Sequence, residues 1–210
     1  MQETIKSRLM SKDKKIEQLF QQSICTKQNC IEQGFHSLYQ IGDSITQSIQ
    51  NGGKIMLCGN GGSAADAQHL AAEMLVRLRP MNNREGVAAI TLAQDTSTIT
   101  ACGNDFGYEI LYERVLRSLG KKGDCLIGIT TSGNSKNVIL AKKAAKELGI
   151  EVFGFLGCGG GEALKYCDEA FIVPSNDTGR IQESHITAGH AVMEYVEDHL
   201  IKSNYLHLEK

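Results

Sequence analysis

Apolar positions divide the chain into a helical first quarter and a longer region in which strands and helices alternate. Within residues 1–50 the apolar side chains recur at helical spacing and proline is absent, which predicts two helices closed by Asn51-Gly52-Gly53. From residue 54 onward, short apolar runs bounded by glycine are followed by stretches with helical periodicity. Such runs are typical of strands buried on both faces of a sheet. The expected strands are 54–58, 87–92, 125–130, 152–156 and 170–173, and the expected helices are 64–78, 110–119, 138–148 and 180–201.

This alternation predicts an α/β fold, a three-layer αβα sandwich with a five-stranded, mainly parallel sheet. No linker-like segment divides the chain. We therefore expect residues 1–210 to form a single domain, with N-terminal helices in 1–50 and the αβα core in 54–202.

Composition and charge exclude several classes of protein. Hydrophobic residues make up 41% of the 210 positions and charged residues 22%, which is ordinary for a globular chain and argues against disorder. The net charge of −2 gives no general attraction to nucleic acid or to anionic membranes, and we expect neither as a partner. The seven cysteines form no CxxC pair, the N-terminus is charged, and no apolar run approaches the ~18 residues of a membrane span. These features predict a cytoplasmic protein.

Two loops rich in small and hydroxyl side chains follow predicted strands. In an open parallel sheet, ligands bind beyond the carboxyl ends of the strands, where both loops fall. The first, 59–63, offers backbone N–H groups, and Ser63 is placed to cap the next helix. Either loop alone is equally consistent with a tight turn, but two at equivalent places favour a ligand that carries a phosphate group. The second loop supplies four hydroxyls, from Thr130, Thr131, Ser132 and Ser135.

Dinucleotide binding is a weaker alternative for the first loop. Gly59, Gly61 and Ala64 match the pattern G-x-G-x-x-A after a strand. However, the acidic residue expected at the end of the second strand is missing, since Asp95 is the first acid after 87–92. The hydroxyl-rich second loop also has no role in such a site, and a Walker loop is absent.

Two groups of polar side chains lie on predicted helices. His69 and Glu73 are four residues apart, so they share a helix face and form either two ligands of a divalent metal ion or an ordinary surface pair. The final helix carries Gln182, His185 and His190, and spacing alone does not choose between the two histidines. Gln182 and His190 are about 80° apart around a straight helix and about 12 Å apart along it. Either Gln182 lies in an irregular first turn, or the two residues serve sites of different chains.

Four segments, CGNGGSAADAQHLAAEM, CGNDFGYE, GITTSGNSKNV and RIQESHITAGH, occur here in an order and spacing that resemble the bacterial sedoheptulose-7-phosphate isomerases. These enzymes, also called phosphoheptose isomerases, belong to the sugar-isomerase (SIS) domain group. The resemblance covers nearly the whole chain. It implies an aldose–ketose isomerase that converts sedoheptulose 7-phosphate to D-glycero-D-manno-heptose 7-phosphate through an enediol, for the synthesis of nucleotide-activated heptose. Lipopolysaccharide core, capsule and other heptose-bearing glycans draw on this product, and the sequence does not distinguish among them.

The resemblance also assigns roles to residues. It implies that Glu73 is the catalytic base and His190 the acid, and that one Zn²⁺ per subunit is held by His69, Glu73, Gln182 and His190. It implies a homotetramer whose active sites are shared between adjacent subunits. The positions that match substrate-binding residues are Asn60, Gly61, Gly62, Ser63, Glu73, Arg77, Asn104, Asp105, Thr130, Thr131, Ser132, Ser135 and Gln182.

Two other functions stay open within the same group. A non-catalytic SIS protein that binds a replication initiator would have no need for His69, Glu73, Gln182 and His190 together, yet all four are present. An isomerase or sensor of a different phosphosugar would fit the phosphate loops equally well. Gly179 stands where some members carry Asp, which leaves the orientation of the substrate open.

Overall fold

The computed structural model describes the backbone of residues 2–93 and 95–208 and the side chains from residue 14 onward. Its centre is a sheet of five parallel strands in the order β2-β1-β3-β4-β5, which confirms the predicted α/β class. The strands are β1 (Ile55–Gly59), β2 (Ala89–Thr91), β3 (Cys125–Thr130), β4 (Glu151–Leu156) and β5 (Glu169–Ile172).

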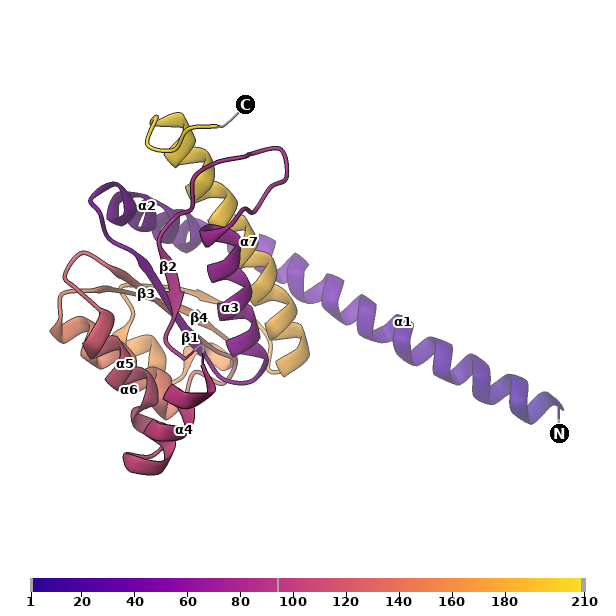
Figure 1. The fold of residues 1–210 in the computed structure, drawn as a ribbon. Helices are drawn as coiled ribbons and strands as arrows, with labels where there is room; N and C mark the ends of the chain where they lie inside the picture. The colour runs from indigo at the N-terminus through magenta and orange to yellow at the C-terminus, as the bar shows by residue number, and fades with distance from the viewer. Residues whose placement is uncertain (1, 94, 209–210) are drawn as a thin grey trace.

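Helices cover both faces of the sheet, which makes three layers (Figure 1). Successive side chains of a strand point to opposite faces. Ile55 and Leu57 of β1 therefore pack into one core, and Met56 and Cys58 into the other. The first core lies under α2 (His36–Gln50), α3 (Gly62–Leu75) and α7 (Thr178–Lys202), and the second under α4 (Thr96–Asp105), α5 (Leu111–Leu119) and α6 (Lys136–Glu147).

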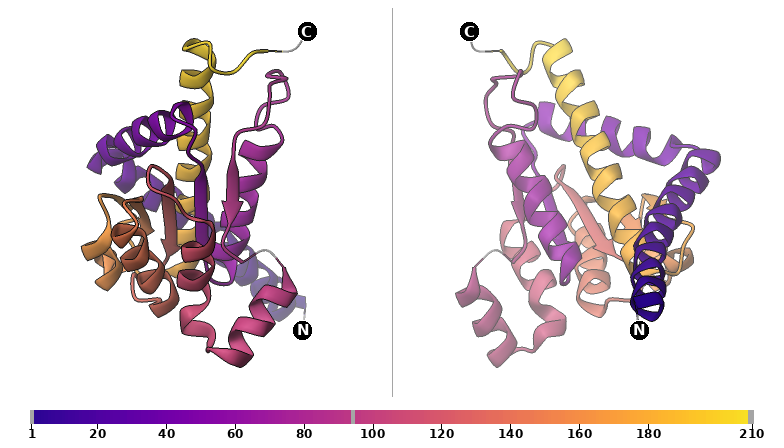
Figure 2. Two further views of the ribbon diagram at one scale, coloured as in Figure 1. Left: turned by 60° about the vertical axis from the view of Figure 1, so that its left-hand side comes forward. Right: turned by 90° about the vertical axis from the view of Figure 1, so that its right-hand side faces the viewer.

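The first helix, α1 (Gln2–Gln33), projects away from the sheet as a long arm (Figures 1 and 2). It is separated from α2 by Gly34, whose φ of +79° is a conformation that glycine adopts readily. The two helices predicted for residues 1–50 are thus confirmed, and α2 ends at Gln50 with Asn51 as its C-cap, as expected. Among the described residues no helix combines the length and apolar character needed to cross a membrane.

The structure departs from the predicted elements where the sequence is polar. Helix α4 was not expected, because its TSTITACGND sequence lacks an apolar period. It is started by Asp95, whose side chain accepts a hydrogen bond from the backbone N of Thr98 at 2.7 Å. Strand β2 has three residues rather than six, and it pairs only with β1 at the edge of the sheet. Three short 3₁₀ segments complete the fold: η1 (Tyr108–Ile110), η2 (Cys158–Gly160) and η3 (Glu162–Tyr166).

Helices α3 and α7 pack side by side on the same face of the sheet. They run in the same direction, because each follows a strand of a parallel sheet. A glycine permits their close approach: a Cβ at Gly189 would lie 2.5 Å from Cδ1 of Leu70. At the start of α3, a Cβ at Gly62 would lie 2.6 Å from Nε2 of Gln182. Residues of the two helices that are far apart in the sequence are therefore brought into contact.

His185 is part of the core between α7 and the sheet. Only 1% of this residue is exposed, and its Nε2 lies 3.0 Å from the backbone O of Leu156, so the neutral ring donates through Nε2. Its Nδ1 is buried and has no hydrogen-bond partner in the described part of the chain. Burial lowers the pKa of His185 to about 4, although the hydrogen bond to Leu156 acts in the opposite direction.

We predict that His185 makes the fold sensitive to mild acid. The unfolded chain takes up a proton on this ring near pH 6.5, whereas the folded chain does so only near pH 4. The neutral His185 ring therefore contributes fully to the free energy of unfolding above pH 6.5. This contribution, on the order of 3 kcal/mol, is lost as the pH falls toward 4. Urea unfolding across this range should show that His185→Gln removes this part of the pH dependence, with His207→Gln, an exposed histidine, as the control. Equal slopes in the wild type and His185→Gln would contradict the prediction.

Candidate active site

The two predicted ligand loops lie at the point where the order of the sheet changes direction. Strands β1 and β3 are neighbours, but the helix that follows β1 covers one face and the helix that follows β3 covers the other. The chain segments after the two strands therefore diverge from a switch point, which is where the crevice of a doubly wound sheet lies. Ligands of doubly wound sheets bind at this switch point.

Hydrogen bonds across the crevice hold Asn60 of the first loop. Its side-chain amide exchanges two hydrogen bonds with that of Asn137 on α6, each of 2.9 Å. Tyr108 donates to Asn60 Oδ1 at 2.7 Å, and Tyr112 donates both to this oxygen and to the backbone O of Gly59. Burial raises the pKa of Tyr112 well above its usual value, so its hydroxyl stays protonated and able to donate. Asn137 and the two tyrosines were missed from the sequence, because no local motif links them to Asn60.

The hydroxyls of the second loop converge at the start of α6. Thr130 Oγ1 lies 2.9 Å from Ser135 Oγ and 3.5 Å from Ser132 Oγ. Ser132 Oγ also accepts a hydrogen bond from the backbone N of Asn134 at 3.1 Å. Thr131 belongs to the same loop and is half-buried. A helix N-terminus surrounded by hydroxyls suits an anion such as a phosphate group.

The first loop is shorter than the sequence indicated, because the helix after it begins earlier. Helix α3 begins at Gly62 with Gly61 as its N-cap, so the expectation that Ser63 caps this helix is wrong. Ser63 already lies in the first turn, is buried, and donates from its backbone N to the O of Asn60 at 3.0 Å. Glycine at position 59 permits this turn, since a Cβ there would lie 2.6 Å from the backbone O of Ser63.

Three titratable side chains meet between α3 and α7, and we call them the His–Glu cluster: His69, Glu73 and His190. The Nε2 atoms of the two histidines are 2.8 Å apart, and Glu73 Oε1 is 3.4 Å from Nε2 of His69. One ligand atom from each residue lies within 4.8 Å of the others. The helical spacing predicted that His69 and Glu73 share a face, but only the packing of α3 on α7 selects His190, since His185 is buried against the sheet.

A carboxylate one turn before His69 also belongs to this region. Asp66 Oδ2 is buried, and no hydrogen-bond partner for it occurs among the described residues. Burial raises the pKa of Asp66, whereas positive charge on His69 and His190 lowers it. The cluster thus lies beside an acidic group that the sequence analysis did not single out.

Gln182 lies apart from the cluster within one chain. Helix α7 is regular from Thr178 onward, with Asp177 accepting a hydrogen bond from the backbone N of Arg180, so the alternative of an irregular first turn is wrong. Regular geometry places Gln182 about 12 Å along the axis from His190. Its side chain lies against Gly62 at the beginning of α3.

Three other expected residues are not brought to the cluster. Arg77 is exposed beyond the end of α3. Asn104 and Asp105 end α4, where Asn104 Nδ2 donates to Asp105 Oδ1 at 2.8 Å and Asp105 borders a cavity between α4 and α5. In the part of the chain that the structure describes, no hydrogen bond or ion pair joins any of the three to the His–Glu cluster.

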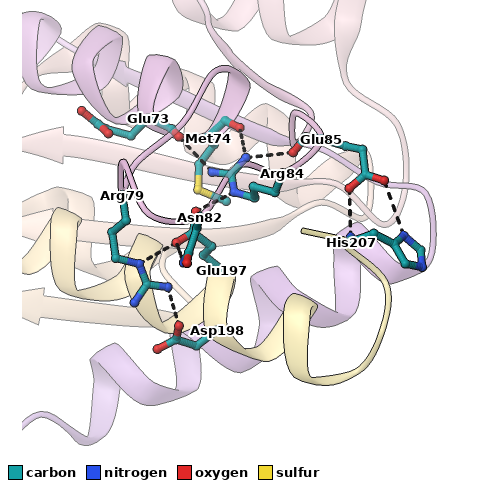
Figure 3. Close-up of polar contacts among 9 residues, drawn as sticks. All are labelled: Glu73, Met74, Arg79, Asn82, Arg84, Glu85, Glu197, Asp198 and His207. Atoms are coloured by element: carbon teal, nitrogen blue, oxygen red, sulfur yellow. Dashed lines mark hydrogen bonds and ion pairs between the residues drawn. The ribbon is translucent and has the colours of Figure 1, made fainter. Parts of the chain in front are cut away.

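A buried ion pair holds the end of α3 beneath the cluster (Figure 3). Arg84 Nε donates to Glu197 Oε1 at 2.6 Å, and both side chains are 0% exposed. The same guanidinium donates to the backbone O atoms of Glu73 and Met74 at 3.1 Å, which satisfies two carbonyls at the helix C-terminus. The backbone of Glu73 is thereby tied to α7.

Two further donors complete this network. Arg79 Nε donates to Glu197 Oε2 at 2.6 Å and Asn82 Nδ2 to the same oxygen at 2.9 Å. Burial alone raises the pKa of Glu197, but the hydrogen bonds from Asn82, Arg84 and Arg79 outweigh it and leave the pKa below its usual value. Glu197 is therefore a carboxylate at neutral pH.

Comparison with known proteins identifies the family to which this chain belongs. The SIS domain family matches residues 18–157, so the chain is a SIS-domain protein. It is 47% identical to the phosphoheptose isomerase of Clostridium acetobutylicum over 187 residues, which cover 88% of this chain and 94% of that protein. Solved phosphoheptose isomerases superpose on it over most of both chains. The enzyme from Neisseria gonorrhoeae has a TM-score of 0.82 and 40% sequence identity, and the match covers 89% of this chain and 98% of that one. The enzyme from Francisella tularensis has a TM-score of 0.83 and 31% sequence identity, and the match covers 88% of this chain and 97% of that one. The chain belongs to the phosphoheptose isomerase family.

We predict that Glu197→Gln destabilises the fold by about 3–5 kcal/mol, because it leaves the buried Arg84 guanidinium without a counter-charge. The matched control is Asp198→Asn, which removes the exposed second partner of Arg79 and should cost less than about 1 kcal/mol. Denaturant unfolding of the two variants beside the wild type measures the difference. A loss for Glu197→Gln no larger than that of the control would show that the pair does not hold α3 on α7.

Proposed function

We propose that this chain converts sedoheptulose 7-phosphate to D-glycero-D-manno-heptose 7-phosphate through an enediol and so supplies the synthesis of nucleotide-activated heptose. The observation that carries the proposal is the His–Glu cluster on α3 and α7, in a sheet whose switch point presents two loops suited to a phosphate group. Along α3, His69 lies about 10 Å from the helix start. A ligand that reaches both places must be extended, and a heptose 7-phosphate carries its reactive carbons and its phosphate at opposite ends.

The proposed chemistry needs one base and one acid. Glu73 takes the proton from C1 of the ketose and returns it to C2. His190 gives a proton to the carbonyl oxygen on C2 and takes one from the hydroxyl on C1, so the carbonyl group moves to C1 and no proton is gained or lost. Both side chains are partly exposed, as access of a substrate requires. Removal of a proton from carbon by a positioned base contributes about 10²–10⁴-fold to such a rate.

The donor set of the cluster fits a divalent metal ion such as Zn²⁺. Two imidazole nitrogens face one another at 2.8 Å with a carboxylate oxygen beside them, and such N and O ligands are those that zinc prefers. His69, Glu73 and His190 would hold the ion, which when bound stabilises negative charge on the oxygens of the enediolate as a Lewis acid. Since Gln182 and His190 of one chain do not meet, a site that uses both draws one of them from a second copy.

We propose that the enzyme is a homotetramer with active sites at subunit interfaces. The support is an unpartnered apolar face: Ile16, Phe20 and Ile24 recur every four residues on the projecting α1 and are each more than half exposed. A groove bordered by α1, α2 and α7 continues from this arm and includes His190 among its lining residues. A second copy that covers these surfaces would therefore border the His–Glu cluster.

We also propose a cytoplasmic location. All seven cysteines lie within the described residues and are free thiols. Free thiols are typical of a reducing compartment.

The test of the function is an isomerase assay on the purified chain with ketose phosphates of seven, six and five carbons. We expect turnover of the seven-carbon substrate, and a loss of at least about 100-fold on Glu73→Gln because the amide cannot accept the proton from C1. The matched control is Glu113→Gln, which alters a partly exposed carboxylate on α5 and should leave turnover unchanged. Turnover of a shorter ketose alone would reject the heptose assignment, and near-normal activity of a folded Glu73→Gln variant would remove Glu73 from the mechanism.

Metal content tests the second part of the proposal. After dialysis against a chelator and reconstitution with Zn²⁺, elemental analysis should find about one ion per wild-type subunit, held by the nitrogen and oxygen donors of the cluster. The His69→Ala variant should lose most of this zinc, and His207→Ala, which alters an exposed histidine far along the chain, should retain it. Full zinc occupancy in His69→Ala would place the metal elsewhere.

A further inference from the structure

Lys142 is a buried cation that the proposed reaction does not use. It lies on α6 with 0% of the residue exposed, and its Nζ is 2.9 Å from Sγ of Cys167 and 3.3 Å from the backbone O of Phe153. Over residues 14–93 and 95–208, no carboxylate forms an ion pair with it. A buried ammonium is costly unless it is paired. Among the described residues, Cys167 is the one side chain to which Lys142 donates a hydrogen bond.

The sheet leaves room for this pair. Gly128 of β3 and Gly154 of β4 are register partners in adjacent strands. A Cβ at Gly128 would lie 2.5 Å from Cε of Lys142, and a Cβ at Gly154 would lie 2.8 Å from Sγ of Cys167. Two neighbouring strands thus lack a side chain where Lys142 and Cys167 pack. The contact between the lysine and the cysteine therefore depends on these two glycines as well as on the flexible side chains.

Cys167 has the surroundings of a reactive thiol. As a thiol it donates to the backbone O of Ala163 at 3.3 Å, and as a thiolate it accepts from Lys142. Oxidants attack the thiolate form of a cysteine, and Nζ of Lys142 lies within hydrogen-bond distance of this sulfur. The residue is half-buried, so a small oxidant can reach it, whereas Cys58 and Cys125 are buried in the core.

We propose that Lys142 and Cys167 form an oxidation-sensitive cross-linking site, in which a peroxide converts this hydrogen-bonded pair to a covalent S–N bond. In the first step the thiolate attacks the peroxide, the O–O bond breaks, and Cys167 becomes a sulfenic acid. The hydroxide released takes a proton from the ammonium and leaves as water. In the second step the Lys142 amine attacks Sγ, the S–O bond breaks, and hydroxide leaves with the second amine proton as water. One H₂O₂ is reduced to two H₂O, and sulfur is oxidised by two electrons; sulfenic acids condense with nitrogen in this way.

The position of the link gives it a consequence for the second ligand loop. Segment η3, which precedes Cys167, donates from the backbone N of Ala163 to the O of Gly133 at 2.8 Å and from that of Glu162 to Oδ1 of Asn134 at 3.0 Å. Helix α6 begins at the end of the same loop. A bond between Lys142 and Cys167 therefore joins the two elements that hold the hydroxyl-rich loop in place. This inference goes beyond the isomerase activity and does not depend on it.

The experiment treats the full-length protein with hydrogen peroxide and follows it by intact-mass and peptide mass spectrometry. We expect the wild type to lose two hydrogens, to yield a linked peptide pair that contains residues 142 and 167, and to return to its original mass with a thiol reductant. Lys142→Arg keeps the positive charge but lacks the primary amine, so it should give no link and instead a Cys167 sulfenic acid that a dimedone probe captures. Cys158→Ser, which removes an exposed cysteine, should retain the link.

Three results would overturn the proposal: wild-type Cys167 that stays reduced while Cys158 is oxidised, a disulfide from Cys167 to another cysteine, or a linked peptide that carries an added oxygen atom. Lys142→Met provides a second variant of similar length without the amine. Its thermal unfolding midpoint, and that of Lys142→Arg, are measured first. A folded variant of either kind that still forms the link would also overturn the assignment of Lys142.

Discussion

The ion pair between Arg84 and Glu197 is the interaction on which the rest of the site depends. Removing two charges from water is costly, and both charges of this pair are fully buried. Their attraction offsets the cost of desolvation only where the hydrogen bonds of both groups are satisfied. Arg84 uses its remaining donors on carbonyls at the end of α3, and Glu197 accepts from two further side chains. The pair therefore joins the end of α3, a connecting loop and the C-terminal part of α7. Since the backbone of Glu73 is one of its acceptors, the position of that residue relative to α7 is fixed by the same network.

The opposite end of α3 is fixed by glycine rather than by charge. Gly62 allows the side chain of Gln182 to lie on the first turn, and Gly189 allows Leu70 to approach α7. Close contact at these points and the ion pair at the far end hold the two helices parallel over several turns. The His–Glu cluster lies between these anchors. One helix thereby links a terminus at the switch point of the sheet with side chains that can move a proton.

Much of the fold could be predicted because buried parallel strands have a local signature, and the five apolar runs correspond to the five strands of the sheet. Helix α4 could not be predicted from the sequence, because it is stabilised by the Asp95 cap and by few buried side chains rather than by an apolar stripe. His69 and Glu73 could be paired from helical spacing, but His190 could be chosen over His185 only after α7 was packed on α3. Pairs such as Arg84 with Glu197 or Lys142 with Cys167 have no periodic signature, since tertiary structure alone brings them together.

Fold and chemistry are carried by different parts of this molecule. A doubly wound sheet with two small-residue loops at its switch point suits a ligand that carries a phosphate group, and this arrangement is compatible with many activities. A carboxylate and two imidazoles placed on neighbouring helices narrow the choice to reactions that move a proton or bind a metal ion. Because a groove reaches His190 from the side of the projecting first helix, a subunit packed there would enclose these groups and limit the access of water. Assembly and catalysis would then be coupled through the same helix, α7, because its His190 belongs both to the His–Glu cluster and to the lining of the groove.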